Sequence, residues 1–538
     1  MKDVEFNLLD EPWVRVLCAD CTVREVSLTE ALLHAHEYKD LAGELPTQDV
    51  AVLRLLLAVL HTVFWDHDAN GVAAPLTDPN TALVRWRGLW RQGQFPEQPI
   101  RDYLAAWHER FWLFHPERPF WQAPNAKIGT QFGAEKLNGD IVESSNSTRL
   151  FSSYSHKAKS HLNYAQAVRW LLYTNGFDDT AAKKKDKNSK VSLQIGWLGQ
   201  LGLIFVKGNT LFETLMLNMV FLQDGEKTWR QPIPCWELPE AHSAERIEVR
   251  PPDNVAELLT LQSRRILLKR ENGKVTGYSL LGGDFFESKD AFCEQMTVWE
   301  KQVDKNGVVS FEPKQYNTAI QFWREFPAVF QSQEKNPGVV QWIVKLQAAH
   351  ILDRKRVITF GIVGMQYNAR HYNTVEDTFS DSLTFHTALL DELGRRWRQK
   401  INEEIDRCGK LAQAVGNLAK NLDIAATDPD HAGKKNSAKA AREQFYFRLD
   451  QPFRRWLCDI DPAWDSETAE KYIFQWRADA KRIAQTLGRQ LVDQSGSAAF
   501  IGRMIKSSSS KVSEKETYYS APKVYNWFLA DVNRVYQK

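Results

Sequence analysis

The sequence predicts an α+β protein: a large mixed N-terminal domain with several short sheets, residues 1–380, followed by a C-terminal antiparallel four-helix bundle, residues 381–538. Two observations support this prediction. Before about residue 380, short β-branched runs alternate with turn clusters and a few apolar helices. After about residue 384, apolar residues recur every three or four positions over long stretches. A chain of 538 residues is long enough for two domains that each bury a core.

The N-terminal domain is expected to mix helices with short strands. The apolar run at 53–60 is typical of a buried helix, and 101–112 and 210–220 also have helical spacing. A hairpin is expected near the N-terminus, with Cys18 and Cys21 in its turn. Further strand-like runs lie at 264–269, 275–281, 297–299 and 356–363.

The C-terminal domain is expected to contain four amphipathic helices. Their apolar stripes cover 390–422, 445–457, 473–491 and the residues after Pro522. The third helix should open at Asp465 and Ser466, because these residue types accept hydrogen bonds from the first turn of a helix. The serine-rich stretch at 506–511 is expected to be a mobile surface loop. Helices of this kind, joined by modest connections, predict an antiparallel bundle.

Composition restricts the function classes. The formal net charge of +2 provides no global basic field, so nucleic acid would have to be contacted through local patches. Of the six cysteines only Cys18 and Cys21 form a CxxC, which indicates a structural role and a reducing compartment. The sequence shows neither an apolar signal core nor a run of about 18 apolar residues. We therefore expect a cytoplasmic protein without a membrane partner.

Catalytic motifs are missing from the sequence. It contains no HExxH, no GxxxxGK[ST] phosphate loop, no GxSxG, and no GxGxxG after a strand. We therefore expect no enzyme, no catalytic residue, no cofactor and no metal. One alternative is a metal-dependent nuclease or phosphohydrolase around Asp66, His67 and Asp68. However, consecutive residues of a helix point in different directions, which favours a solvated loop there.

The stretch at 361–370 is the most informative in the chain. An apolar β-branched run leads to Gly361 and Gly364, which we expect to relax a polar tip beyond the strand. Amide, aromatic and guanidinium groups at such a tip suit the reading or separation of stacked bases. An ordinary polar loop would have the same composition. The residues of this tip are Gln366, Tyr367, Asn368, Ala369 and Arg370.

Three basic segments are candidates for contacting nucleic acid. Residues 183–190 hold five lysines without an apolar anchor, typical either of a charged surface loop or of a loop that follows phosphates. Arg264 and Arg265 begin a strand and therefore face opposite ways, so at most one can face a ligand. The third segment interleaves aromatic and basic groups, as in a nucleic-acid groove or a flexible surface loop. Its residues are Arg149, Phe151, Tyr154, His156, Lys157 and Lys159.

In this order, these segments resemble the CasA family, the large subunit of the type I-E CRISPR surveillance complex Cascade. The resemblance covers essentially the whole chain, through the stretches at 6–16, 110–122, 208–218 and 259–265 and the final bundle. It implies a non-enzymatic subunit that recognises the protospacer-adjacent motif in double-stranded target DNA from the minor groove and wedges the duplex open to start R-loop formation. The implied partners are crRNA, the backbone, small and crRNA-end-binding Cascade subunits, and a recruited helicase–nuclease.

The resemblance also implies site residues. The family's wedge falls on Gln366, Tyr367, Asn368, Ala369 and Arg370, with either Gln366 or Asn368 supplying the acting amide. Its minor-groove lysine falls on Lys289, and its crRNA-contacting loop near residues 148–163. The stretch at 269–274 has no cysteine cluster, so zinc is not expected. The family's short glycine loop falls on Thr180, Ala181, Ala182, Lys183, Lys184 and Lys185, where lysines would contact phosphates instead.

A helical scaffold that binds only protein is the remaining alternative.

Overall fold

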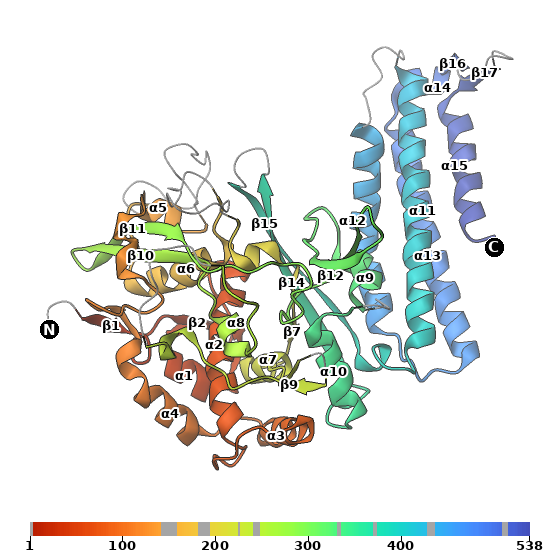
Figure 1. Ribbon diagram of the computed structural model, residues 1–538. Helices are drawn as coiled ribbons and strands as arrows, with labels where there is room; N and C mark the ends of the chain where they lie inside the picture. The colour runs from red at the N-terminus through yellow and green to blue at the C-terminus, as the bar shows by residue number, and fades with distance from the viewer. Residues whose placement is uncertain are drawn as a thin grey trace. The chain divides into compact units, whose positions relative to one another are not determined.

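The chain divides into two compact units. The computed structural model describes residues 4–140, 159–180, 194–223, 226–239, 248–330, 335–368, 374–427, 436–507 and 515–537. Unit 1 comprises residues 1–353 and 358–383, and unit 2 comprises 354–357 and 384–538. The predicted limit at residue 380 lies close to this change of unit. Several small sheets in unit 1 and long helices in unit 2 confirm the predicted α+β class (Figure 1).

Unit 1 is built from short helices around small sheets. Its sheets have the strand orders β1-β5, β3-β2-β4, β10-β11-β6, β15-β14-β7, β8-β9 and β12-β13. The strands are β1 (Glu5–Asn7), β2 (Val14–Cys18), β3 (Val23–Val26), β4 (Tyr38–Leu41), β5 (Trp112–Phe114), β6 (Thr130–Gly133), β7 (Leu203–Lys207), β8 (Leu222–Gln223), β9 (Lys227–Thr228), β10 (Arg264–Glu271), β11 (Lys274–Gly282), β12 (Trp299–Val303), β13 (Val309–Pro313), β14 (Val357–Asn368) and β15 (Thr374–His386). The helices are α1 (Leu28–Leu33), α2 (Pro46–Asp66), α3 (Pro79–Gln92), α4 (Glu97–Ala106), α5 (Ala134–Leu137), α6 (Tyr164–Phe177), α7 (Leu211–Asn218), α8 (Val255–Leu259), α9 (Phe326–Phe330) and α10 (Gly338–Ala348).

The centre of unit 1 is α2, which packs against α4, α6, α7 and α8. Pro46 lies in its first turn, where a missing N–H costs nothing. Among the described residues, α2 alone is long and apolar enough to cross a membrane, but 94% of its apolar window is buried inside the unit. The helix contains no uninterrupted run of about 18 apolar residues, as predicted, because Asp49, Arg54 and His61 lie within it. Arg54 interrupts the run and is neutralised by Glu294 at 2.9 Å, because a buried charge requires a partner.

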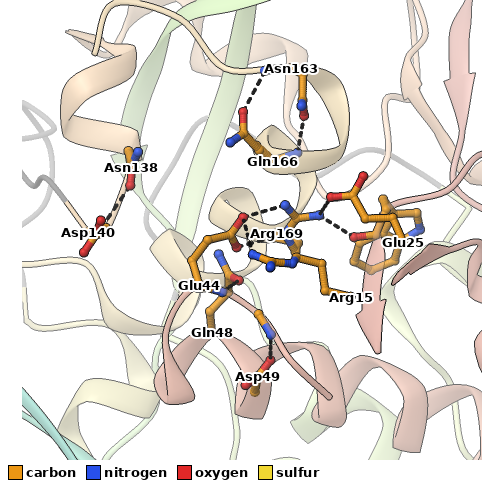
Figure 2. A network of polar contacts seen from close by, with 12 residues as sticks. Arg15, Glu25, Glu44, Gln48, Asp49, Asn138, Asp140, Asn163, Gln166 and Arg169 are labelled. Carbon is orange, nitrogen blue, oxygen red and sulfur yellow. Dashed lines mark hydrogen bonds and ion pairs between the residues drawn. The ribbon is translucent and has the colours of Figure 1, made fainter. Parts of the chain in front are cut away.

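A second ion network, centred on the buried Arg169, fixes α6 (Figure 2). The Arg169 guanidinium donates to the Glu44 carboxylate at 2.9 and 2.5 Å and to Glu25 at 2.9 Å. Burial alone would raise the pKa of Glu44, but the hydrogen bonds from Arg169 lower it. Arg169 also donates to the carbonyl of Trp13 at 2.6 Å. The network joins α6 to the β2–β3 hairpin and to the turn before α2.

Two predicted elements of unit 1 differ from the structure. The helix expected at 101–112 ends at Ala106 and is followed by a 3-10 turn and by β5. Backbone pairing of β5 with β1 overrides the helical spacing there. The strand expected at 297–299 begins at Trp299 and continues through polar residues, because it is held by pairing with β13.

Unit 2 is a helical region whose apolar stripes face one another. Its long helices are α11 (Arg395–Ala426), α12 (Asn436–Cys458), α13 (Ser466–Asp493) and α15 (Ala521–Val535). Helix α11 packs against each of the other three, and Figure 1 shows the four standing side by side. Glu404 of α11 is buried and accepts from Arg407 at 2.6 Å and from Arg477 of α13 at 2.8 Å. As predicted, Asp465 caps α13 by accepting from the Thr468 amide at 2.9 Å.

A small element before α15 was not predicted. Helix α14 (Gly496–Ile501) precedes an antiparallel pair, β16 (Arg503–Ser507) and β17 (Lys515–Tyr519). The expected loop at 506–511 is therefore wrong for Lys506 and Ser507, which lie in β16. Residues 508–511 are outside the described residues.

Candidate nucleic-acid interface

The stretch with the predicted DNA-contacting tip is the second half of a strand. Strand β14 is the central strand of its sheet, between β15 and β7, and pairs antiparallel with β7. Gly361 and Gly364 lie inside it rather than in a relaxed tip. A Cβ atom at Gly361 would stand 2.8 Å from the Phe205 ring, and one at Gly364 would stand 2.5 Å from the Phe379 ring. Close packing of these rings, and not flexibility, requires glycine at both positions.

Tyr367 is an anchor. Successive side chains of a strand point to opposite faces, so Tyr367 faces away from Gln366 and Asn368. Its hydroxyl donates to the carbonyl of Phe177, the last residue of α6, at 2.7 Å. Burial raises the pKa of Tyr367 well above its ordinary value. The expectation that its ring stands in a free tip is therefore wrong: the hydroxyl needs a buried acceptor, and it finds one inside the unit.

Gln366 and Asn368 share the other face of the strand. Both amides donate to the Glu376 carboxylate of β15, Gln366 at 3.1 Å and Asn368 at 2.5 Å. The Gln366 oxygen accepts from the Thr318 hydroxyl at 2.8 Å. Gln366 and Glu376 are exposed and Asn368 is half-buried. The end of β14 thus presents two oriented amides at the surface, with Tyr367 fixed behind them.

The second feature of the site is the loop stem, the residues on either side of 181–193: Phe177, Asp178 and Asp179 before it, and Gln194 after it. The two aspartates are buried, and each has its own cation. Arg264 Nε lies 2.5 Å from Asp178 Oδ2, and Lys136 Nζ lies 2.5 Å from Asp179 Oδ2. Two buried ion pairs therefore hold the first side of the stem.

Arg264 also joins the two sides of the stem. One of its terminal nitrogens lies 3.1 and 3.2 Å from the carbonyl oxygens of Asp178 and Asp179, and 2.7 Å from that of Gln194. Since Tyr367 contacts the carbonyl of Phe177, the residue before Asp178, the same stem also supports the end of β14.

The predicted DNA contacts of Arg264 and Arg265 are wrong. The two residues are 2% and 0% exposed, and Arg265 pairs with Asp284 at 2.5 Å. The start of their strand is covered on both faces, so each guanidinium is neutralised by a buried carboxylate instead of reaching the surface.

The remaining predicted residues divide into two groups. Thr180 follows the stem directly, Lys159 is half-buried, and Lys289 is exposed in a turn rather than on a strand. The others lie outside the described residues: Ala369, Arg370, Ala181, Ala182, Lys183, Lys184, Lys185, Arg149, Phe151, Tyr154, His156 and Lys157.

The alternative metal site at residues 66–68 is not assembled. The Asp68 carboxylate accepts from the amides of Asn70 and Val72, at 2.8 and 2.9 Å, and so closes a turn. Nδ1 of His67 lies 3.2 Å from the carbonyl oxygen of Val63. Within the described ranges, which include residues 66–68, no three His, Cys, Asp or Glu side chains are grouped to hold a metal ion.

Comparison with known proteins identifies the family. The family model described as CRISPR-associated protein Cse1 matches residues 7–487. The chain belongs to the Cse1 family. Over 235 residues, 44% of this chain, it is 34% identical to the CRISPR-associated protein CasA/Cse1 of Thermus thermophilus, and the match spans 42% of that relative. The predicted CasA family is therefore confirmed.

Solved structures of Cse1 have the same fold. The crystal structure of Thermobifida fusca Cse1 aligns with a TM-score of 0.83 and 26% identity over 98% of both chains. A chain of a structure described as a CRISPR RNA-guided surveillance complex aligns with a TM-score of 0.66 and 16% identity, over 98% of this chain and 99% of that one.

Sequence reasoning missed three residues of this Cse1 site: Lys136, Asp178 and Glu376. Lys136 and Asp178 lie far in the sequence from their partners Asp179 and Arg264, and only the fold brings the members of each pair together. Glu376 lies near the start of a strand that the sequence did not indicate, because the first half of β15 is polar.

Proposed function

We propose that this protein is the non-catalytic large subunit of a cytoplasmic, type I-E RNA-guided Cascade complex. In this proposal it recognises the protospacer-adjacent motif in target DNA from the minor groove, opens the adjacent base pairs and helps to recruit a helicase–nuclease. Its other partners are crRNA and the remaining Cascade subunits. Support comes from membership of the Cse1 family and from the shared fold with a chain of an RNA-guided surveillance complex.

The observation that carries the proposal is the pair of amides at the end of β14. Opening a base step costs a few kcal/mol, and proteins that do so insert side chains from a supported element. Gln366 and Asn368 stand at the end of a strand that is paired with β7 over Thr359–Val363, and Tyr367, between them, is held by the carbonyl of Phe177. Amide groups can donate to the minor-groove acceptors of A·T pairs and accept from the guanine amino group.

The loop stem supports the same role. Its buried ion pairs hold residues 179 and 194 in place beside the end of β14. The sequence between them contains the lysines at 183, 184, 185, 187 and 190, residue types that bind phosphates. In this proposal the strand contacts bases and the lysines contact phosphates, which divides the work between opening and positioning.

The test is the double variant Gln366→Ala/Asn368→Ala in the assembled complex. We expect assembly on crRNA to be retained and affinity for a target duplex to fall at least tenfold, since each good base contact contributes about 1–3 kcal/mol. A matched control is Gln413→Ala/Asn417→Ala, which removes two exposed amides that bond to each other on α11. Unchanged duplex affinity in the first variant would exclude the proposed wedge.

A further inference from the structure

We infer that Glu376 is a positioning residue that orients the amides of Gln366 and Asn368 for base-pair opening; this inference rests on the proposed function. One carboxylate serves both side chains, because each of its oxygens accepts from a different amide. Gln366 and Asn368 are two positions apart on one strand face, so a single acceptor on the neighbouring strand reaches both.

The chemistry of the acceptor determines how the amides point. An ionised carboxylate accepts hydrogen bonds and donates none, so each amide must turn its NH₂ group toward β15. The oxygen of Gln366 then accepts from Thr318, which fixes that amide at both ends. Without Glu376, both amides would lose the acceptor that orients their NH₂ groups, and restoring that orientation would oppose insertion into the duplex.

The hydrogen bonds from the two amides to Glu376 are weak enough to be replaced by hydrogen bonds to a base. Glu376 and Gln366 are exposed, so water competes for these hydrogen bonds and each contributes little net stability. An incoming base edge can replace the carboxylate as partner of an amide at small cost. A phosphate cannot approach as easily, because its charge is repelled by that of Glu376. The carboxylate therefore favours neutral base edges over backbone phosphates at this position.

The experiment measures opening separately from binding. The assembled complex is mixed with a target duplex that carries 2-aminopurine at the first base pair beside the motif, and the rise in fluorescence reports opening. We expect Glu376→Ala to lower the opening rate about three- to tenfold, because the two amide side chains must then be ordered during insertion. Glu376→Gln, which keeps one acceptor, should give an intermediate rate. Asp377→Ala is the matched control, because Asp377 is exposed and lies on the opposite face of β15.

A second readout distinguishes positioning from a merely structural role. Both Glu376 variants should bind a duplex that lacks the motif more tightly than wild type, because a negative charge has been removed. In the Gln366→Ala/Asn368→Ala background, Glu376→Ala should cause no further loss of opening.

The outcomes are separable. If the double amide variant is impaired but Glu376→Ala and Glu376→Gln open the duplex at the wild-type rate, the role of Glu376 is refuted and the proposed function stands. If the double amide variant opens the duplex as wild type does, both are refuted. An additive loss in the triple variant would also contradict the inference, because Glu376 would then act independently of the two amides.

Discussion

Replacing Arg264 by Met tests whether the loop stem depends on one buried cation. Met preserves most of the side-chain volume but removes the charge and all the donors. The Arg264 and Asp178 side chains are each 3% exposed, so Asp178 would be left as a buried carboxylate without its cation. Removing one partner of a buried pair costs about 3–5 kcal/mol of unfolding free energy. The three main-chain carbonyls contacted by Arg264 would lose a donor as well.

Two measurements examine this variant. Urea unfolding, followed by tryptophan fluorescence, gives the loss of stability. Hydrogen exchange at Gly196, whose amide donates to the Asp178 carbonyl at 3.0 Å, reports on the stem itself and should become faster. Arg101→Met is a matched control, because Arg101 and Glu97 form an exposed pair within one helix that contributes less than about 0.5 kcal/mol.

A buried unpaired carboxylate costs several kcal/mol. A fall in unfolding free energy below about 1 kcal/mol, together with unchanged hydrogen exchange at Gly196, would therefore show that the stem does not depend on Arg264. The double variant Arg264→Met/Asp178→Asn should recover part of the loss. If the double variant is no more stable than Arg264→Met, the stability lost in that variant comes from the carbonyl contacts rather than from the ion pair.

Two further predictions concern single groups. Tyr367→Phe should lower the urea stability by about 0.5–1.5 kcal/mol, because the Phe177 carbonyl loses its donor; no loss would show that this contact is not an anchor. Asp49 lines a cavity of about 340 Å³ beside Lys207, and burial raises the pKa of its carboxyl to about 7. The folded state therefore binds this proton more tightly than the unfolded state, so this group's contribution to stability falls as the pH rises from about 4 to 7, by at most about 4 kcal/mol. Asp49→Asn should remove this slope, and identical pH profiles of urea stability would contradict it.

Regular patterns in the sequence were sufficient for the core helix and for the helices of unit 2. The run at 53–60 marks α2, and the stripes after residue 384 mark α11, α12, α13 and α15, because burial on one helix face leaves a period in the sequence. Helix boundaries were less accurate: α11 begins at Arg395, five residues after the first residue of its stripe at position 390.

The errors in the site have a common physical cause. A strand pattern shows which residues share a face but not whether that face is covered. The pattern of Arg264 and Arg265 therefore fits a ligand contact, although both faces of β10 are covered where these two residues lie. For the same reason, alternation separates Tyr367 from Gln366 and Asn368 but does not reveal which side is inside. The glycines of β14 were misread because the rings that require them lie on other strands, at Phe205 and Phe379.

The main-chain contacts of Arg264 have a consequence for how this protein can change. Every residue type carries the same main-chain carbonyl oxygen. The contacts of Arg264 therefore do not require a particular side chain at position 194 or at any position from 180 to 193. Mutations can change the length or the charge of the segment 181–193 while the contacts of Arg264 with both sides of the loop stem are retained.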